Sequence, residues 1–460
     1  MASRMRRMRL SALHCRLLCR SSTSLPSHRE IFSYTFSPSQ RFFSAGRSWK
    51  PVTEKQVVIS RGLGSRVATI NNPKRANALT TAMARKLRTF YERWESEVGA
   101  NLVILQGAGG VFSSGADVKE LYRLGLQGNF EACREFFREL YNLNYVLGTY
   151  RRLQVSVLDG LAVGGACALT SFSHFQLASE NAAFSSPETR IGFHPDAGSS
   201  FLLSCLKGSF GEYLALTGEK LDMTDMIMTR LVQNPIQSKR IPEILHQLHS
   251  LDTTDEEVVT NIIEAFEDGI EVDPDSFLHR EEIINRIFSL EKVEDIIYAL
   301  EAEAEGRDYA WYRDVLDNIR AASPLSQKIA LKSIRMARQE TLAESLQREY
   351  RISCRAISGN LSKDFYEGVR AHLIDKDHNP KWSPGYLESV SDDMVDAYFQ
   401  PFENEAEELE LPLNKREGIS NAADSDVSLH GAPQSAGEGQ TEDVEILNWA
   451  MNVDAGTKKT

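Results

Sequence analysis

Two carboxylates stand in a turn that is rich in glycine and proline. Glu188 and Asp196 lie within residues 186–198, among small and apolar residues. Burial among such residues disfavours the charged form of a carboxyl group and raises its pKa toward neutral pH, where it can act as a general acid or base. Glu188 and Asp196 are therefore candidate catalytic residues.

Two loops upstream could bind an oxygen atom through backbone N–H groups. The first covers residues 112–118 and the second covers residues 164–169, and each is predicted to join a strand to a helix. Small side chains let the main chain approach a ligand, and the following helix adds a favourable dipole. Neither loop fits a phosphate-binding P-loop. Two N–H donors aimed at one oxygen would form an oxyanion hole for acyl transfer.

The elements around these loops predict an α/β domain over residues 51–220. A helix is expected after Thr80 or Thr81, and strands are expected at 56–60, 66–70, 102–106, 154–158, 175–178 and 182–185. Strands that alternate with helices are typical of α/β folds. Residues 221–402 are predicted to be mostly helical, because their apolar residues recur at helical spacing.

The two ends of the chain differ from its body. Ten Lys or Arg and a single acid, Glu30, occur in residues 1–50, and one helical face there would carry Leu10, Leu13, Leu17 and Leu18. A basic amphipathic helix without a continuous apolar stretch predicts a mitochondrial transit peptide over residues 1–43, with a chloroplast address as the closer competitor. Residues 403–460 are acidic and polar and are predicted to form a disordered tail.

Composition excludes several classes of protein. The chain has 460 residues and a formal net charge of −12, and this acidity argues against a nucleic-acid-binding domain. No stretch reaches the roughly 20 apolar residues of a membrane span. The cysteines are scattered without the paired spacing of a zinc site, so no metal is expected.

Further motifs extend the pattern along most of the chain. Residues 71–79 are similar to a CoA-binding turn of the crotonase, or enoyl-CoA hydratase/isomerase, superfamily. Residues 214–218 match that superfamily as well, while 364–371 and 374–382 resemble the C-terminal motif of its 3-hydroxyisobutyryl-CoA hydrolase branch. The resemblance covers about residues 55–400 and implies a crotonase-like spiral of ββα repeats with a mostly helical C-terminal half.

The resemblance also implies a role for each site residue. The backbone N–H groups of Ala116 and Gly165 would hold the thioester oxygen, Glu188 would attack the thioester or activate water, and Asp196 would orient the substrate hydroxyl or assist proton transfer. The substrate pocket would include Leu140 and Gly164. CoA would contact Lys74, Arg75, Ala76, Ala78, Leu79, Ala116 and Asp117, with Lys376 and Lys381 as further candidate partners of its phosphates.

These roles imply hydrolysis of 3-hydroxyisobutyryl-CoA, or of a related short β-hydroxyacyl-CoA thioester, in the mitochondrial matrix. CoA would enter as part of the substrate, with no further cofactor and no nucleic-acid or membrane partner. Hydration by two glutamates is disfavoured, because Ala168 stands where hydratases carry one of them. Leu140 replaces an active-site glutamate of the hydrolases, so reduced activity, or a structural role in the small subunit of the mitochondrial ribosome, is the alternative.

Overall fold

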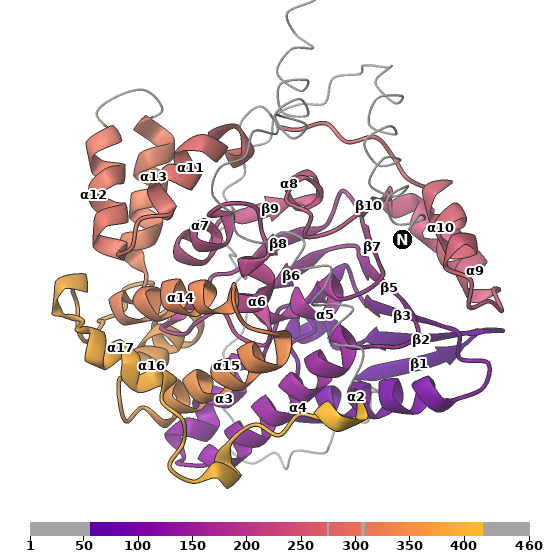
Figure 1. Cartoon of the computed structure of the whole chain (residues 1–460), viewed down its shortest axis with the longest axis horizontal. Coiled ribbons are helices and arrows are strands. Elements are labelled where there is room, and N and C mark those ends of the chain that lie inside the picture. The colour runs from indigo at the N-terminus through magenta and orange to yellow at the C-terminus, as the bar shows by residue number, and fades with distance from the viewer. Residues whose placement is uncertain (1–55, 274–275, 305–308, 417–460) are drawn as a thin grey trace, which may run out of the picture. The chain divides into compact units, whose positions relative to one another are not determined.

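Two β-sheets form the frame of the N-terminal half. The computed structural model describes residues 56–273, 276–304 and 309–416. The larger sheet has the strand order β1–β2–β3–β5–β7–β10 and the smaller one β4–β6–β8–β9 (Figure 1). The strands are β1 Val57–Arg61, β2 Ser65–Ile70, β3 Leu102–Gly107, β4 Val111–Ser113, β5 Leu153–Leu158, β6 Leu161–Val163, β7 Phe175–Ala178, β8 Ala183–Ser185, β9 Lys220–Asp222 and β10 Asn234–Pro235.

Helices connect these strands and make up most of the C-terminal half. Up to residue 228 they are α2 Thr81–Ser96, α3 Val118–Leu126, α4 Phe130–Gly148, α5 Ala168–Ser171, α6 Ser199–Ser204, α7 Phe210–Thr217 and α8 Met223–Met228. Beyond it they are α9 Ile241–His249, α10 Glu256–Glu264, α11 Glu281–Phe288, α12 Val293–Glu303, α13 Tyr309–Ala321, α14 Pro324–Ala337, α15 Leu342–Ser358, α16 Asp364–Val369 and α17 Asp392–Phe399. Among the described residues, no helix has both the length and the apolar character needed to cross a membrane.

From β3 to β8, consecutive strands alternate between the two sheets. β3, β5 and β7 pair in parallel in the larger sheet, and the strands that follow them, β4, β6 and β8, pair in parallel in the smaller one. A helix or helical turn follows each pair, so the predicted spiral of ββα repeats, and with it the α/β fold class, is confirmed. Because parallel neighbours run in one direction, the carboxyl ends of β4, β6 and β8 lie side by side.

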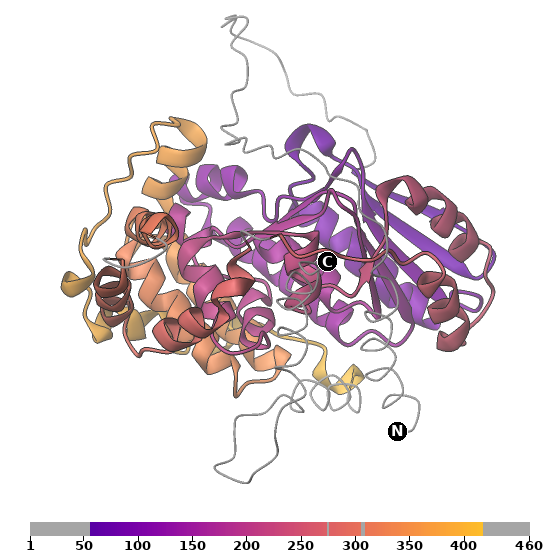
Figure 2. The same cartoon turned by 90° about the horizontal axis from the view of Figure 1, so that it is seen from above.

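The larger sheet is covered on both faces, which explains the nearly continuous apolar character of its parallel strands. Val67 and Ile104 belong to one buried cluster with Ile244 of α9 and Ile263 of α10. Alternate strand residues such as Val103 instead belong to the main core with α2. Strand β9, which starts at Lys220, and strand β10 add the last strands to the two sheets, and α9 and α10 cover one face of the larger sheet. The remaining C-terminal helices gather on the opposite side of the strands (Figure 2).

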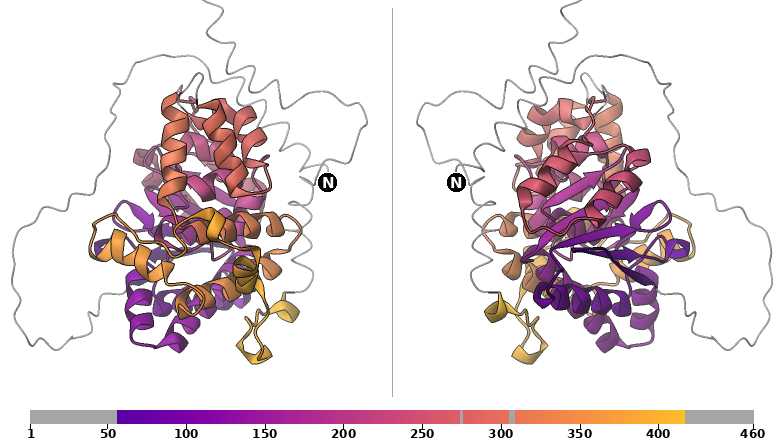
Figure 3. Two further views of the ribbon diagram at one scale, coloured as in Figure 1. Left: turned by 90° about the vertical axis from the view of Figure 1, so that its left-hand side faces the viewer. Right: turned by 90° about the vertical axis from the view of Figure 1, so that its right-hand side faces the viewer.

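Residues 403–416, the first part of the segment predicted as a tail, contact the body. Glu408 pairs with Arg351 of α15 at 2.8 Å, and Arg416 pairs with Glu95 of α2 at 2.7 Å. Figure 3 shows this yellow segment beside the indigo and purple helices of the N-terminal half. The predicted transit peptide at 1–43 and residues 417–460 lie outside the described residues.

Candidate active site

Three loops meet at the carboxyl ends of β4, β6 and β8. A Cβ atom placed on Gly115 would lie 2.8 Å from the carbonyl oxygen of Val163, so the first two loops are in direct contact. A Cβ atom on Gly164, where φ is +57°, would lie 2.2 Å from Oε1 of Glu188. One on Gly165 would lie 3.6 Å from Oδ1 of Asp196. The structure therefore brings together the three segments that the sequence analysis singled out.

The two predicted oxyanion donors lie at the junction of the first two loops. Ala116 lies opposite Leu79 in a short parallel β-bridge. The N–H of Leu79 donates to the carbonyl oxygen of Gly115, and the carbonyl oxygen of Leu79 accepts from the N–H of Asp117. Gly165 lies in the short 3₁₀ turn Gly164–Ala166 that follows β6. Among the hydrogen bonds of the described residues, none uses the N–H of Ala116 or of Gly165. Both donors can therefore serve an external oxygen without the loss of a bond in the loops.

Glu188 begins the turn after β8 and is buried against the second loop. Its residue is 7% exposed, and its Oε2 accepts a hydrogen bond from Ser186 Oγ at 2.7 Å. Its Oε1 is buried without a hydrogen-bond partner among the described residues. Burial raises the pKa of Glu188 to about 7, against the opposing effect of the Ser186 hydroxyl. Glu188 can therefore exchange a proton near neutral pH.

Asp196 lies at the start of a chain of buried polar groups. Its Oδ2 is 2.8 Å from the hydroxyl of Tyr141, which is 2.7 Å from the hydroxyl of Ser353. Ser353 Oγ is 2.9 Å from Nε2 of His194. Burial, together with the charges of Glu188 and Glu349, raises the pKa of Asp196 well above its ordinary value. The two candidate acids thus lie close enough to influence each other's ionisation.

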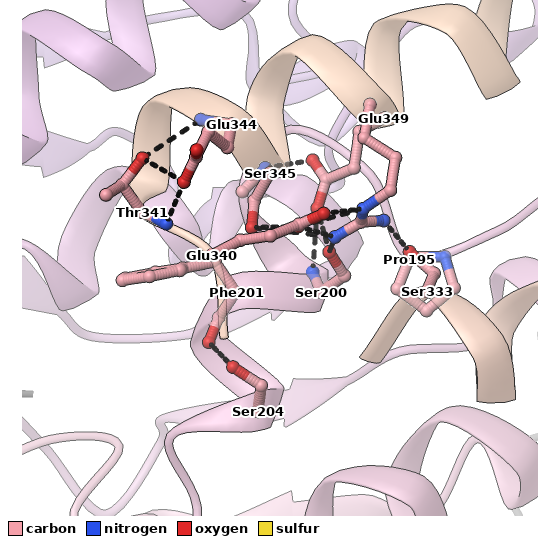
Figure 4. A network of polar contacts seen from close by, with 12 residues as sticks. Pro195, Ser200, Phe201, Ser204, Ser333, Glu340, Thr341, Glu344, Ser345 and Glu349 are labelled. Carbon is pink, nitrogen blue, oxygen red and sulfur yellow. Dashed lines mark hydrogen bonds and ion pairs between the residues drawn. The ribbon is translucent and has the colours of Figure 1, made fainter. Parts of the chain in front are cut away.

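A third buried acid, Glu349 on α15, supports the turn that carries Asp196. It accepts hydrogen bonds from the N–H of Gly198 at 2.6 Å and of Ser200 at 3.0 Å, and also from the Ser200 hydroxyl. Figure 4 shows Glu349 reaching from α15 to Ser200 at the start of α6. Burial raises the pKa of Glu349 to about 7, while the neighbouring Arg348 opposes this shift.

The predicted CoA-binding residues surround the first loop. Arg75 ends the 3₁₀ turn Pro73–Arg75 and pairs with Asp117 at 2.7 Å, with its side chain 48% exposed. Asp117 is the N-cap of α3, and burial raises its pKa while Arg75 opposes the shift. Lys74 is exposed beside Ala76, and Ala78 and Leu79 are buried. These residues border the oxyanion loop, whereas Lys376 and Lys381 lie on the exposed segment after α16.

Leu140 is buried in the apolar core at 2% exposure. The adjacent Glu139 instead turns toward α2, where it pairs with Arg85 and Arg88 at 2.9 Å each. Successive side chains on a helix point about 100° apart, so Leu140 and Glu139 face different directions. The acid beside Leu140 therefore does not replace the glutamate that the resemblance places at this position.

Tyr141, Ser353 and Glu349 were not predicted from the sequence to be site residues. Glu349 and Ser353 are four residues apart on one face of α15, and both reach the turn around Asp196. A polar stripe at this spacing is usually the solvent-facing side of a helix, so the sequence carries no signal that these residues are buried. Among the described residues, no group of three or more His, Cys, Asp or Glu side chains could hold a metal ion.

The three loops place two backbone N–H donors beside a buried carboxylate, and comparison with known proteins assigns the family. Residues 65–399 match the enoyl-CoA hydratase/isomerase family, so the chain belongs to that family, as predicted. A carnitinyl-CoA dehydratase from Mycobacterium thermoresistibile has a similar structure, with a TM-score of 0.70, 28% identity and coverage of 78% of this chain and 99% of that one.

Two curated relatives from Arabidopsis thaliana are more similar in sequence. One is named 3-hydroxyisobutyryl-CoA hydrolase-like protein 1, mitochondrial, and is 42% identical over 79% of this chain and 91% of its own length. The other is named small ribosomal subunit protein mS47 and is 42% identical over 79% of this chain and 90% of its own length. The resemblance to the hydrolase branch is thereby confirmed, as is the mitochondrial location predicted from the N-terminus.

Proposed function

We propose that the protein hydrolyses 3-hydroxyisobutyryl-CoA, or a related short β-hydroxyacyl-CoA thioester, to the free acid and CoA. The observation that carries this proposal is the buried Oε1 of Glu188, which has no hydrogen-bond partner in the described part of the chain and faces the loop that holds one of the two oxyanion donors. The similarity to a relative named as hydrolase-like supports it. CoA is part of the substrate, and the proposed chemistry needs no other cofactor.

In this mechanism Glu188 acts as the base. Its carboxylate removes a proton from water, and the resulting hydroxide adds to the thioester carbonyl. The N–H groups of Ala116 and Gly165 hold the oxyanion that forms, and each such donor is worth about 3 kcal/mol in other hydrolases. The C–S bond then breaks, and the CoA thiolate leaves and takes up the proton. Direct attack by Glu188 on the carbonyl is the other route, and it needs the same ionised carboxylate.

The rate should therefore follow the ionisation of Glu188. Burial raises its pKa to about 7, so kcat/KM should increase with pH through about 7 and fall about tenfold per unit below it. The measurement is thiol release between pH 5 and pH 9, with circular dichroism at each pH to show that the protein stays folded. A rate that is flat across this range, or that falls as pH rises through 7, contradicts the assignment of Glu188 as the base.

Arg75 should contribute to the affinity for CoA. Arg75→Gln should raise KM for the acyl-CoA about tenfold and leave kcat within about twofold, because one charge-assisted hydrogen bond to a phosphate is lost. Arg313→Gln is the matched control, since Arg313 is also about half exposed and pairs with an acid, Asp314. Equal KM values for the two variants would exclude Arg75 from the CoA site.

The assay that tests the proposed function is the release of CoA thiol from a series of short acyl-CoA thioesters by the purified chain. Release from 3-hydroxyisobutyryl-CoA is expected, with slower release from thioesters that lack the β-hydroxyl group. A folded protein that releases no thiol from any member of the series would overturn the proposal.

A second function is favoured by two observations. One relative is named as a protein of the small ribosomal subunit, and Leu140 is an apolar residue where the hydrolase branch carries a glutamate. The alternative is a structural subunit of the mitochondrial ribosome. A folded chain that lacks thiol release and sediments with the small ribosomal subunit in a sucrose gradient would establish it.

A further inference from the structure

Four buried contacts connect the carboxyl group of Asp196 to a backbone carbonyl group. Asp196 Oδ2 contacts Tyr141 at 2.8 Å, Tyr141 contacts Ser353 at 2.7 Å, and Ser353 contacts Nε2 of His194 at 2.9 Å. The chain ends where Nδ1 of His194 lies 3.1 Å from the carbonyl oxygen of Pro195. The four side chains are at most 5% exposed, so they must satisfy one another.

Each contact needs one proton, and this requirement determines the direction of every bond. A carbonyl oxygen only accepts, so Nδ1 of His194 carries the proton that faces Pro195. The neutral imidazole then accepts at Nε2, and Ser353 donates to it. Ser353 must in turn accept from Tyr141, and Tyr141 accepts from Asp196. The proton at the start of the chain therefore lies on Oδ2 of Asp196.

An ionised Asp196 does not satisfy the same contacts. Tyr141 would then donate to Asp196, and its 2.7 Å contact with Ser353 would join two oxygen atoms without a proton between them. Only a charged His194 could repair this arrangement. Burial and the nearby Arg348 lower the pKa of His194 to about 3, so it is neutral at physiological pH. The hydrogen-bonded series therefore satisfies all four contacts when Asp196 is neutral.

The surrounding charges also favour a neutral Asp196. Glu188, after β8, and Glu349, on α15, both face it and disfavour a third negative charge. Glu349 accepts N–H bonds on both carboxylate oxygens, which favours its ionised form. The three buried acids can therefore hold different charges, with Glu349 ionised, Asp196 neutral and Glu188 able to change near neutral pH.

We propose that Tyr141, Ser353 and His194 are positioning residues that hold Asp196 as a neutral acid, and that its free oxygen, Oδ1, accepts a hydrogen bond from the β-hydroxyl group of the substrate. Oδ1 faces the second loop, where a Cβ atom on Gly165 would lie 3.6 Å away. In this arrangement Asp196 selects β-hydroxyacyl thioesters and transfers no proton. The substrate part of this inference rests on the proposed hydrolase function.

Asp196→Asn separates a neutral from an ionised Asp196. A carboxamide can place its NH₂ group toward Tyr141 and keep an acceptor at Oδ1, so kcat/KM should fall only about 3–10-fold. Asp196→Leu removes the acceptor, and it should lower kcat/KM at least ~30-fold for 3-hydroxyisobutyryl-CoA but much less for isobutyryl-CoA, which lacks the hydroxyl group. A loss of 100-fold or more in Asp196→Asn, on the scale of a lost proton transfer, would overturn the inference.

Infrared spectroscopy gives a readout that does not depend on activity. At pH 8 the carbonyl band of a protonated carboxylic acid should be present in the full chain and absent after Asp196→Asn. It should shift in Tyr141→Phe, because the partner of the acid proton is removed, and remain unchanged in Asp314→Asn, which alters an exposed acid. If the spectra of Asp196→Asn and of the full chain show the same carboxylic-acid band, Asp196 is not neutral and the inference is wrong. If the band is present but neither the full chain nor any variant releases thiol, only the proposed hydrolysis is contradicted.

Discussion

Glu188→Gln should lower kcat/KM for thioester hydrolysis about 1,000-fold, within the range of 10² to 10⁴ for loss of a general base. The amide keeps the size of the side chain and can still accept a hydrogen bond from Ser186, but it cannot take up a proton or attack the carbonyl. KM should change by less than about threefold, because the CoA-binding residues are untouched. Rates of thiol release at pH 8 provide the measurement.

The matched control for this change is Glu92→Gln, which neutralises a half-exposed acid of α2 that pairs with Arg88. Its rate should stay within about twofold of the parent. Glu92→Gln should unfold near the temperature of the parent, because Glu92 is half exposed. Glu188→Gln should unfold at the same temperature or above it. Burial raises the pKa of Glu188, so ionising it at pH 8 costs stability, and a neutral amide removes that cost. A Glu188→Gln enzyme with more than about a tenth of parental activity would show that another group performs the attack.

Gly164→Ala should lower kcat/KM about 100-fold while the protein stays folded. The added Cβ atom would lie 2.2 Å from Oε1 of Glu188, so the catalytic carboxylate must move away from the oxyanion donors. A displacement of this size at a reacting group is enough for a loss of that order. The left-handed backbone, with φ at +57°, adds a strain of about 1–2 kcal/mol for any residue other than glycine.

Gly128→Ala isolates the effect of backbone strain from that of the contact. Gly128 also has a left-handed backbone, with φ at +72°, but a Cβ atom there would have nothing within 4 Å. Both variants should lose similar stability in thermal unfolding, and only Gly164→Ala should lose activity. Similar kcat/KM values in the two would mean that Glu188 does not work from the position seen in the structure.

The frame of the site was predictable because it depends on local signals. Apolar runs ended by glycine or polar residues predicted the strands, and the alternation of strands with helices predicted the α/β fold. The short strands β4 and β6, which directly precede the first two loops, were not among the expected strands, and the grouping of the three loops was implied by the family resemblance. The structure explains that grouping, because β4, β6 and β8 pair in parallel and their carboxyl ends lie at the same edge.

The support of Asp196 could not be predicted in the same way. Gly198 and Glu349 are separated by 151 residues along the chain, and their contact depends on how α15 packs beside α4 and α6. Helical periodicity predicts which face of α15 is apolar, but not which polar residues of that helix will be buried against a turn. The boundary of the tail could not be predicted for the same reason, because a long-range ion pair with Glu95 holds Arg416 against the body of the protein.

We propose above all that this site cleaves the C–S bond of a β-hydroxyacyl-CoA. The direct measurement is mass spectrometry of the products after the full chain is incubated with 3-hydroxyisobutyryl-CoA at pH 8, beside Glu188→Gln. Free CoA and 3-hydroxyisobutyrate are expected in equal amounts, formed at least ~100-fold more slowly by the variant. Conversion to the unsaturated acyl-CoA with the thioester intact, or recovery of unchanged substrate from a folded protein, would contradict this proposal.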